Sequence, residues 1–310
     1  MRYQDLLQEF AWKPVIEGGA MPQASRVVVG GMGGSALPAN AARFLDPTLS
    51  LSTHRDYDLP EVVDTDALHI AISDSGNTVE TLSFAKAAYE RGLKLAVIDA
   101  GGELADIAEK EVLPFVRVPS GLQPRDSLFY LLNALLALIG REDLRAALAA
   151  VSFDADAAEQ ESRSLAGTLT GALPLFYVSR TNGFLAYASK IHVNETAKMP
   201  AVANLFPELN HNEMQSFDSS APEAVVALAR FVLLRDANDD PRIARRMDVF
   251  AELMRARGRS VTEVPLLGAT RAEQLARHWF VMHRTARMLA EARGVDPDTV
   301  SLVEDFKKRL

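Results

Sequence analysis

Short runs rich in β-branched residues alternate with amphipathic stretches along the chain, and this alternation restricts the fold more than any other feature. In the first half the runs are 26–31, 49–54, 67–73, 93–99 and 114–119. Helical periodicity separates them, as in the stretch from Thr78 to Arg91. Five strands with intervening helices predict a parallel, doubly wound α/β sheet with helices on both faces.

The same alternation begins again after residue 152, so we predict two α/β domains in tandem, 1–152 and 153–310. Two apolar helices, 126–139 and 142–150, are expected to end the first domain. In the second domain we expect strands at 172–179, 231–236 and 260–266, helices at 184–198, 241–257 and 272–293, and a final helix after Pro297. The proline-containing stretch between residue 198 and the strand at 231 is expected to be a loop.

Composition excludes several classes of function. With 33 Lys and Arg against 41 Asp and Glu, the net charge of -8 offers no positive field for nucleic acid, so none is expected as a partner. The chain has no cysteine, which excludes disulfides and thiolate chemistry and fits a cytoplasmic location. The longest apolar stretch, Leu128 to Ile139, is too short for a membrane span, and the N-terminus does not resemble a secretory signal.

A glycine-rich loop follows the first expected strand and precedes a helix. Gly33, Gly34 and Ser35 lie where the backbone N–H groups of a helix N-terminus can bind an anion. Two other interpretations remain open at this point. The glycines can simply permit a tight turn, and the pattern GxGxxA at 31–36, followed by Asp56, also matches a dinucleotide fingerprint.

A second polar loop, SDSGNTVET at 73–81, follows the third expected strand. The hydroxyls of Ser73, Ser75 and Thr78 would lie at another helix N-terminus, although Ser75 or Asn77 could serve only as an ordinary helix cap. Both loops follow the carboxyl ends of parallel strands, where α/β sheets bind ligands. Together they favour a phosphate site without a pocket for adenine.

The second loop resembles the SxSGNTxET signature of the sugar isomerase (SIS) domain family. Four further motifs follow the pattern of one group in this family: GMGGS at 31–35, QPR at 123–125, NExxK at 194–198 and PELNHNE at 207–213. A lysine also lies in the last turn of the chain. In this order, over almost the whole length, the motifs resemble those of the bifunctional phosphoglucose/phosphomannose isomerases, which are built from two SIS domains.

The resemblance implies a tandem of two SIS domains, each an αβα sandwich, that interconverts glucose 6-phosphate, and mannose 6-phosphate as a second epimer, with fructose 6-phosphate. It implies a homodimer whose active site lies near the interface, with His211 donated across it. It implies no cofactor. By resemblance, phosphate is held by Gly33, Gly34, Ser35, Ser73, Ser75 and Thr78, Glu195 is the base, Arg125 stabilises the intermediate, and His211 and Lys307 assist ring opening.

The chemistry of isomerisation suits these residue types. A carboxylate can move a proton between C1 and C2, a guanidinium can stabilise the enediolate, and an imidazole can exchange protons with the sugar ring. From local sequence alone, Glu195 could instead pair with Lys198, and Arg125 could be a surface residue. Lys307 could only complement a helix dipole, and Lys308 could replace it in the proposed role.

The remaining histidines do not have the spacing of metal ligands, so no metal is predicted. His278 and His283 are expected to pack or cap. Asp74 and Asp126 depart from the family pattern, because each brings a carboxylate near the predicted phosphate. We expect their side chains to point away or to cap helices, and the alternative is a changed substrate or a lost activity. The rival functions are a phosphosugar-binding regulator, an isomerase of another sugar phosphate, including an amino sugar, and an NAD(P)-dependent dehydrogenase.

Overall fold

The computed structural model describes residues 2–309 and divides the chain into two compact units, Arg2–Val151 and one that begins at Ser152. Each unit contains one parallel sheet with helices on its faces, which confirms the predicted α/β class. None of the helices within residues 2–309 combines the length and the apolar composition that a bilayer crossing requires.

The first unit contains a five-stranded sheet in the order β2-β1-β3-β4-β5, and all its strand pairs are parallel. Its strands are β1 (Val27–Gly30), β2 (Leu51–His54), β3 (Leu68–Ser73), β4 (Lys94–Asp99) and β5 (Phe115–Arg117). Its helices are α1 (Tyr3–Ala11), α2 (Leu37–Leu45), α3 (Val79–Glu90), α4 (Gly102–Lys110), α5 (Leu128–Leu138) and α6 (Glu142–Ala149), with short 3₁₀ turns η1 (Gly33–Ala36) and η2 (Pro124–Asp126).

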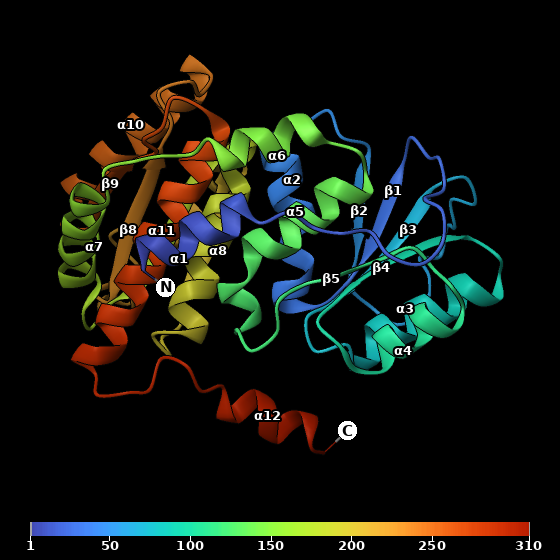
Figure 1. Ribbon diagram of the computed structural model, residues 1–310. Coiled ribbons are helices and arrows are strands. Elements are labelled where there is room, and N and C mark those ends of the chain that lie inside the picture. The colour runs from blue at the N-terminus through green and yellow to red at the C-terminus, as the bar shows by residue number, and fades with distance from the viewer. Residues whose placement is uncertain (1, 310) are drawn as a thin grey trace. The chain divides into compact units, whose positions relative to one another are not determined.

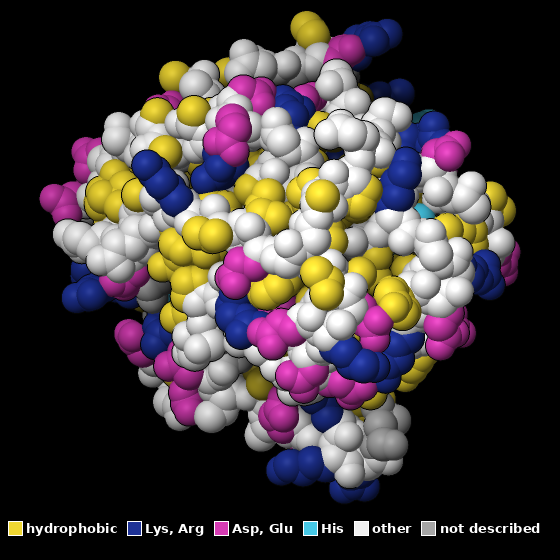
Figure 2. Space-filling model, turned by 45° about the vertical axis from the view of Figure 1, so that its right-hand side comes forward, with side chains coloured by type: hydrophobic (Ala, Val, Ile, Leu, Met, Phe, Trp, Pro, Cys, Tyr) yellow, Lys and Arg dark blue, Asp and Glu magenta, His cyan; other side chains and the backbone are white. Residues whose placement is uncertain are grey.

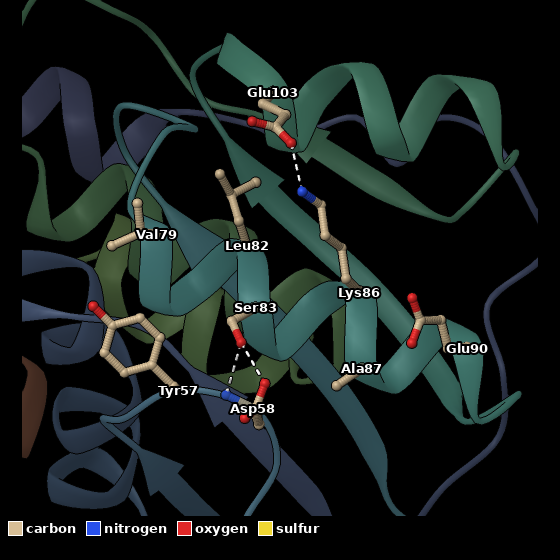
Figure 3. A pocket seen from close by; sticks show the side chains of 9 residues that line it. All are labelled: Tyr57, Asp58, Val79, Leu82, Ser83, Lys86, Ala87, Glu90 and Glu103. Atoms are coloured by element: carbon tan, nitrogen blue, oxygen red, sulfur yellow. Dashed lines mark hydrogen bonds and ion pairs between the residues drawn. The ribbon is translucent and has the colours of Figure 1, made fainter.

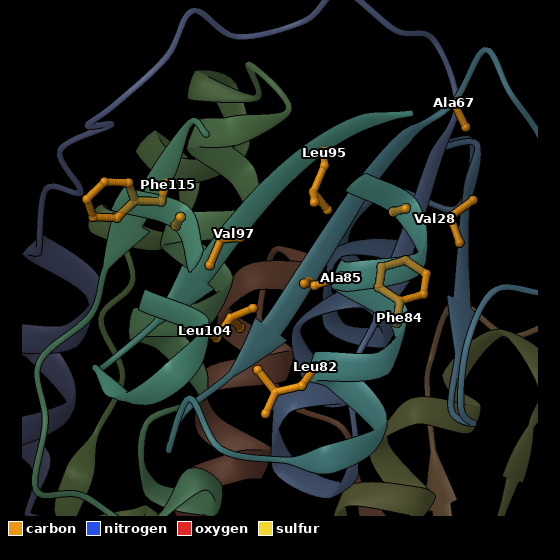
Figure 4. Packing of buried hydrophobic residues seen from close by; sticks show 12 residues of the cluster. Val28, Ala67, Leu82, Phe84, Ala85, Leu95, Val97, Leu104 and Phe115 are labelled. Carbon is orange, nitrogen blue, oxygen red and sulfur yellow. The ribbon is translucent and has the colours of Figure 1, made fainter. Parts of the chain in front are cut away.

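Helices α3 and α4 pack on one face of this sheet, while α2 and α5 cover the other (Figure 1). The core under α3 and α4 is apolar, and Figure 4 shows Phe84 of α3 against the strands, beside Val28. Phe84 is fully buried, and burial of a phenylalanine side chain is worth roughly 1.5–3 kcal/mol. This packing fixes α3 on the sheet, so the N-terminus of the helix is held at the carboxyl end of β3.

The strand order places the predicted phosphate loops beside each other. The chain crosses from β2, on one side of β1, to β3 on the other side, so the direction of winding reverses between β1 and β3. Connections that diverge in this way leave a crevice at the carboxyl ends of the two strands. The loops 31–35 and 74–78 follow these two strands and therefore border that crevice.

The second unit contains a four-stranded parallel sheet in the order β7-β6-β8-β9. Its strands are β6 (Leu173–Ser179), β7 (Val202–Phe206), β8 (Ala229–Arg235) and β9 (Ser260–Pro265). Its helices are α7 (Ala155–Leu169), α8 (Gly183–Glu195), α9 (Glu223–Val226), α10 (Pro241–Ala256), α11 (Arg271–Ala292) and α12 (Ser301–Lys307), with 3₁₀ turns η3 (Arg180–Asn182), η4 (Glu208–His211) and η5 (Glu213–Phe217).

Two details of the second unit correct the sequence analysis. Strand β7 lies in the stretch that was expected to be a loop, since a short, half-buried edge strand between two prolines has little apolar signal. Helix α8 ends at Glu195 rather than at residue 198. The backbone of Lys198 has φ of 56°, a left-handed conformation in which an α-helix cannot continue.

Helix α1 is anchored to α5 through a buried carboxyl group. The side chain of Glu9 is 2% exposed, and its Oε2 accepts the backbone N–H of Phe129 at 3.1 Å, in the first turn of α5. Asn133 donates from Nδ2 to the main-chain oxygen of Glu9 at 3.0 Å. Burial raises the pKa of Glu9 to about 8, although the N–H donation from α5 opposes that rise.

We predict that Glu9→Gln removes a pH dependence of stability. Because the folded-state pKa lies above the value of 4.5 for an unperturbed carboxyl, native Glu9 keeps its proton where the unfolded chain loses it. Its contribution is therefore present below pH 4.5 and is lost as the pH rises to 8, a change on the order of 5 kcal/mol. Urea unfolding from about pH 4 to about pH 9 measures the slope.

The exposed Glu61→Gln is the matched control for this measurement, and it should keep the wild-type slope. Parallel stability curves for wild type and Glu9→Gln across this range would show that Glu9 does not titrate as described.

Candidate functional site

The structure brings the two predicted phosphate loops of the first unit into direct contact. Ser35 lies in η1, and its Oγ accepts the backbone N–H of Asp74 at 3.1 Å. Ser73 ends β3, and its hydroxyl lies 3.1 Å from the hydroxyl of Thr78. Ser75 accepts the backbone N–H of Asn77 at 3.3 Å. Four predicted hydroxyls therefore border one crevice, at the reversal between β1 and β3.

These hydrogen bonds leave hydroxyl protons to be donated. A serine oxygen that accepts an N–H uses a lone pair, and its own hydrogen remains available. This is the case for Ser35 and for Ser75, while in the Ser73–Thr78 pair one hydrogen serves the pair and the other can point elsewhere. A phosphate is an acceptor-only ligand, so a crevice with several hydroxyl donors is chemically suited to it.

The start of α3 is not closed by a side-chain cap. Thr78 is the N-cap residue, and it makes no side-chain hydrogen bond to the first turn. Side-chain caps are made by Asp154 for α7, by Asp240 for α10 and by Thr270 for α11, whereas α3 shares an uncapped start with helices such as α2, α4 and α5. Ordinary capping of α3 by Ser75 or Asn77 is therefore not what this loop does. Uncapped N–H groups at a helix start add to the donors available for an anion.

A neighbouring helix holds the second loop in place. The side chain of Asn77 accepts the backbone N–H of Glu103 at 3.1 Å and donates to the oxygen of Ser75 at 3.0 Å. The oxygen of Gly76 accepts the N–H of Leu104 at 2.9 Å. Gly76 has φ of +66°, and a Cβ atom there would lie 1.6 Å from the oxygen of Gly101. The loop is thus clamped against the start of α4, and only glycine fits at its centre.

Asp74 connects this loop to the turn that carries Arg125. Its Oδ1 accepts the hydroxyl of Ser127 at 3.2 Å, and Arg125 lies two residues before that serine, in η2, with 2% exposure. The side chain of Asp74 therefore bonds to another loop and does not cap α3. Burial raises the pKa of Asp74, and the bond from Ser127 partly opposes this. Asp126 lies in η2, before the first turn of α5.

The candidate base lies in the second unit, at the end of α8. Glu195 is the last residue of that helix and is half-buried. The ammonium of Lys198 donates to the main-chain oxygen of Glu195 and, at 3.3 Å, to that of Pro297. Arg293 donates to the oxygens of Ala197 and Lys198 at 2.6 and 2.9 Å. Two cations thus stabilise the carbonyl-rich end of α8 and fix the last turn.

His211 and Lys307 are exposed. His211 ends η4, and its ring makes no hydrogen bond within residues 2–309. Lys307 lies in α12, where its ammonium pairs with Glu304 at 2.9 Å and its side chain is 63% exposed. In Figure 1, α12 is the short helix that ends the chain after a stretch without regular structure. The structure does not bring Lys307 into contact with Glu195 or His211.

The carboxyl end of the second sheet contains a cluster that sequence analysis did not identify. Asn182, in the turn η3 that follows β6, donates from Nδ2 to Asp236 and to Asp239, each at 3.1 Å. Arg271 bonds to the amide oxygen of Asn182 at 2.5 Å and to Asp236 at 3.3 Å. Burial raises the pKa of Asp239. The position that corresponds to the phosphate loops of the first unit is here occupied by the chain's own carboxylates.

The buried histidines of α11 are packing residues, as expected. His278 lies 2.8 Å from the hydroxyl of Ser189, and burial lowers its pKa to about 4, so it is neutral at physiological pH. His283 contacts the ring of His192, with centroids 5.8 Å apart. Among the described residues, no group of three or more histidine, aspartate and glutamate side chains is arranged to hold a metal ion.

A surface hollow of about 470 Å³ follows one side of α3 (Figure 3). Tyr57 and Asp58 form one wall, and Lys86 pairs with Glu103 across the other at 2.6 Å. None of the predicted site residues lines the hollow, although one lining residue, Val79, directly follows Thr78 in the chain. On the face drawn in Figure 2, basic and acidic side chains are interspersed.

Comparisons with known proteins agree with the motifs. Residues 158–310 match the family model described as the bacterial phospho-glucose isomerase C-terminal SIS domain. A bifunctional phosphoglucose/phosphomannose isomerase of Caldicellulosiruptor bescii is 34% identical, over 92% of this chain and 89% of that protein. One of Aquifex aeolicus is 31% identical, over 97% and 95%. A solved hypothetical protein of Thermus thermophilus, 17% identical, aligns with a TM-score of 0.74 over 99% of this chain and 86% of that one.

We predict that Gly76→Ala disrupts the predicted phosphate loop 74–78, whereas Gly92→Ala does not. The two glycines have nearly the same φ, +66° and +64°, but a Cβ at Gly92 meets nothing within 4 Å. Gly92→Ala should therefore cost only the left-handed strain, about 1–2 kcal/mol. Gly76→Ala adds the clash with Gly101, so it should destabilise the protein further and weaken binding of inorganic phosphate. Urea unfolding and phosphate titration measure the two effects, and equal effects at both positions would contradict the described clamp.

Proposed function

The chain belongs to the family of bifunctional phosphoglucose/phosphomannose isomerases, and on this premise we propose that it interconverts fructose 6-phosphate with glucose 6-phosphate, and with mannose 6-phosphate as the second epimer. The proposal assigns the phosphate group of the sugar to the first unit. It assigns the base, the histidine and the C-terminal lysine to the second unit.

The observation that carries the proposal is the set of hydroxyls at the reversal between β1 and β3. Ser35 and Ser75 accept backbone N–H groups and keep their own protons for an acceptor, and α3 begins without a side-chain cap. We assign phosphate binding to Ser35, Ser73, Ser75 and Thr78, with the backbone of Gly33 and Gly34 beside them. Gly33 has φ of +48° and open space around its missing side chain, which lets a ligand approach the backbone.

The proposed reaction is a proton transfer within the open-chain sugar. The carboxylate of Glu195 removes the proton from C2 of the aldose, the C1–C2 double bond forms, and the carbonyl electrons move to O1 to give an enediolate. Return of the proton to C1, together with transfer of the hydroxyl proton of O2 to O1, makes O2 the carbonyl oxygen and gives the ketose. Arg125 stabilises the enediolate charge, and His211 and Lys307 exchange protons with the ring oxygen and O1 during ring opening.

This chemistry is balanced without a cofactor, because one carbon is oxidised while its neighbour is reduced in the same molecule. The proposal therefore includes no nicotinamide and no metal ion. It also includes a cytoplasmic location, since a chain with no cysteine needs no oxidising compartment.

The proposal further includes a homodimer with the active site near its interface. His211 is exposed, as expected for a residue that acts in the partner's site. Helix α12 also exposes large apolar side chains, Leu302 and Phe306 among them, at 83% and 62%. Apolar side chains in this number on one short helix favour a partner surface.

We predict that the protein converts fructose 6-phosphate to aldose 6-phosphate in D₂O without added cofactor, and that Glu195→Gln abolishes the conversion. Proton NMR of the anomeric signals measures the reaction, and the ratio of glucose to mannose signals gives the epimer specificity. Deuterium at C2 of the product is expected, because the carboxyl group exchanges its proton with solvent between removal and return. Glu195→Gln should still bind the sugar phosphate.

Other outcomes of this experiment, together with a measurement of thermal stability, distinguish the rival functions. Sugar phosphate binding without turnover by the wild type would select a regulator or another substrate, including an amino sugar phosphate. A rise in thermal stability with NAD(P) would favour a dehydrogenase. Turnover retained in Glu195→Gln would remove Glu195 from the mechanism.

We predict that mixing Glu195→Gln, which is inactive, with His211→Ala, which keeps a residual turnover, restores activity if His211 acts across the interface. In a mixed dimer of Glu195→Gln and His211→Ala subunits, one site would carry both substitutions and the other neither. Random reassociation should then recover about a quarter of wild-type turnover, because half of the dimers are mixed and each has one intact site. If His211 acts within its own subunit, every site keeps one defect and the mixture gains no turnover over the His211→Ala subunits that it contains.

A further inference from the structure

The segment that presents His211 is attached to the second sheet by a carboxylate. This segment, 207–218, consists of the two 3₁₀ turns η4 and η5, with His211 at the end of the first. Glu213, at the start of η5, accepts the phenol hydroxyl of Tyr177 with Oε1 and the amide Nδ2 of Asn204 with Oε2. Both oxygens of the carboxylate are therefore bonded to strands of the sheet, two residues from His211.

The two donors form a matched pair on the sheet. Tyr177 of β6 and Asn204 of β7 are direct partners in the parallel register, so the two donors come from adjacent strands at the same level. A carboxylate bound by two donors from adjacent strands has a fixed position and a fixed direction. A single hydrogen bond would leave the turn free to rotate about that bond.

Aromatic side chains of the core hold the phenol ring of Tyr177 in place. Tyr177 is completely buried, and its ring contacts the rings of Phe206, Phe231 and Phe250 at centroid distances of 6.3, 5.6 and 5.6 Å. Burial and the adjacent carboxylate both raise the pKa of the phenol, so it keeps its proton and donates it. The aromatic cluster thereby transmits the rigidity of the core to the side chain of Glu213.

The apolar contacts and the bonds within the segment do not fix its direction in the same way. Leu209 is fully buried and Phe217 packs on Phe231 at 4.8 Å, but apolar contacts are non-directional. The bonds within the segment, such as that from Asn212 to Glu208 at 2.9 Å, join exposed residues of the same turns. Asp218, at the far end of the segment and seven residues from His211, pairs with Arg257 at 3.1 Å. The carboxylate of Glu213 is therefore the directional contact with the sheet that lies nearest to His211.

We propose that Glu213 is a positioning residue for His211: through Tyr177 and Asn204 it fixes the direction in which the segment presents the imidazole to the sugar ring. The inference rests on the proposed isomerase function. Glu213 itself does not touch the reacting atoms. Within the motif PELNHNE, His211 reacts with the sugar and Glu213 orients the histidine.

The test is a double-mutant cycle between Tyr177→Phe and His211→Ala, measured as kcat and KM for fructose 6-phosphate. Tyr177→Phe removes one oxygen and keeps the buried ring. We expect it to lower kcat about tenfold with little change in KM, because general acid–base catalysis depends on the direction of the proton donor. In the His211→Ala background the same substitution should cause no further loss, because the residue that it positions is absent.

Tyr89→Phe is the matched control. The hydroxyl of Tyr89 also donates to a glutamate, Glu111, but on the surface of the first unit, and its removal should leave both kinetic constants unchanged. Glu213→Gln is the second variant if Tyr177→Phe does not fold. Its amide can accept from only one of the two strand donors, so kcat should fall in the same direction.

The outcomes separate the inference from the function. An equal loss of kcat from Tyr177→Phe in the wild-type and His211→Ala backgrounds, or an unchanged kcat in both Tyr177→Phe and Glu213→Gln, would overturn the positioning role while the isomerase function stands. A wild type without isomerase turnover would overturn the proposed function, and the positioning role with it.

Discussion

The candidate site depends on two serine hydroxyls, those of Ser35 and Ser75, whose oxygens accept hydrogen bonds from backbone N–H groups. Ser35 accepts the N–H of Asp74, and this bond joins the loop after β1 to the loop after β3. Because the serine oxygen accepts in this bond, its own hydrogen remains available for an acceptor in the crevice between the two strands. The strand order supplies the crevice, the packing of Phe84 fixes α3, and the clamp around Gly76 fixes the loop between them.

Features that a short stretch of sequence specifies could be predicted, and features that depend on distant partners could not. The alternation of strands and helices predicted both sheets, and the polar loops predicted the hydroxyls that line the first crevice. The short edge strand β7 was missed because its few half-buried residues carry little pattern. Glu9 and Glu213 were missed because each resembles a surface acid until the fold brings a helix start or a buried phenol to it.

Asp74 illustrates how a departure from a family pattern can be accommodated. Burial raises the pKa of Asp74, and the hydroxyl of Ser127, which donates to its Oδ1, partly opposes this rise. The backbone N–H of the same residue supports Ser35. Asp74 thus connects three segments of the first unit, the two predicted phosphate loops and the turn with Arg125.

The four strands of the second sheet repeat the order of the first four strands of the first sheet, yet the carboxyl ends of the two sheets differ in electrostatic character. In the first unit this end offers the hydroxyl hydrogens of Ser35 and Ser75, whereas in the second Asp236 already neutralises Arg271 and Asn182 bonds to two aspartates. An anion entering the second position would have to displace a carboxylate that is covalently part of the chain. The repeated strand order therefore supports unlike chemistry at the two carboxyl ends, with hydroxyl donors in the first unit and an internally neutralised polar cluster in the second.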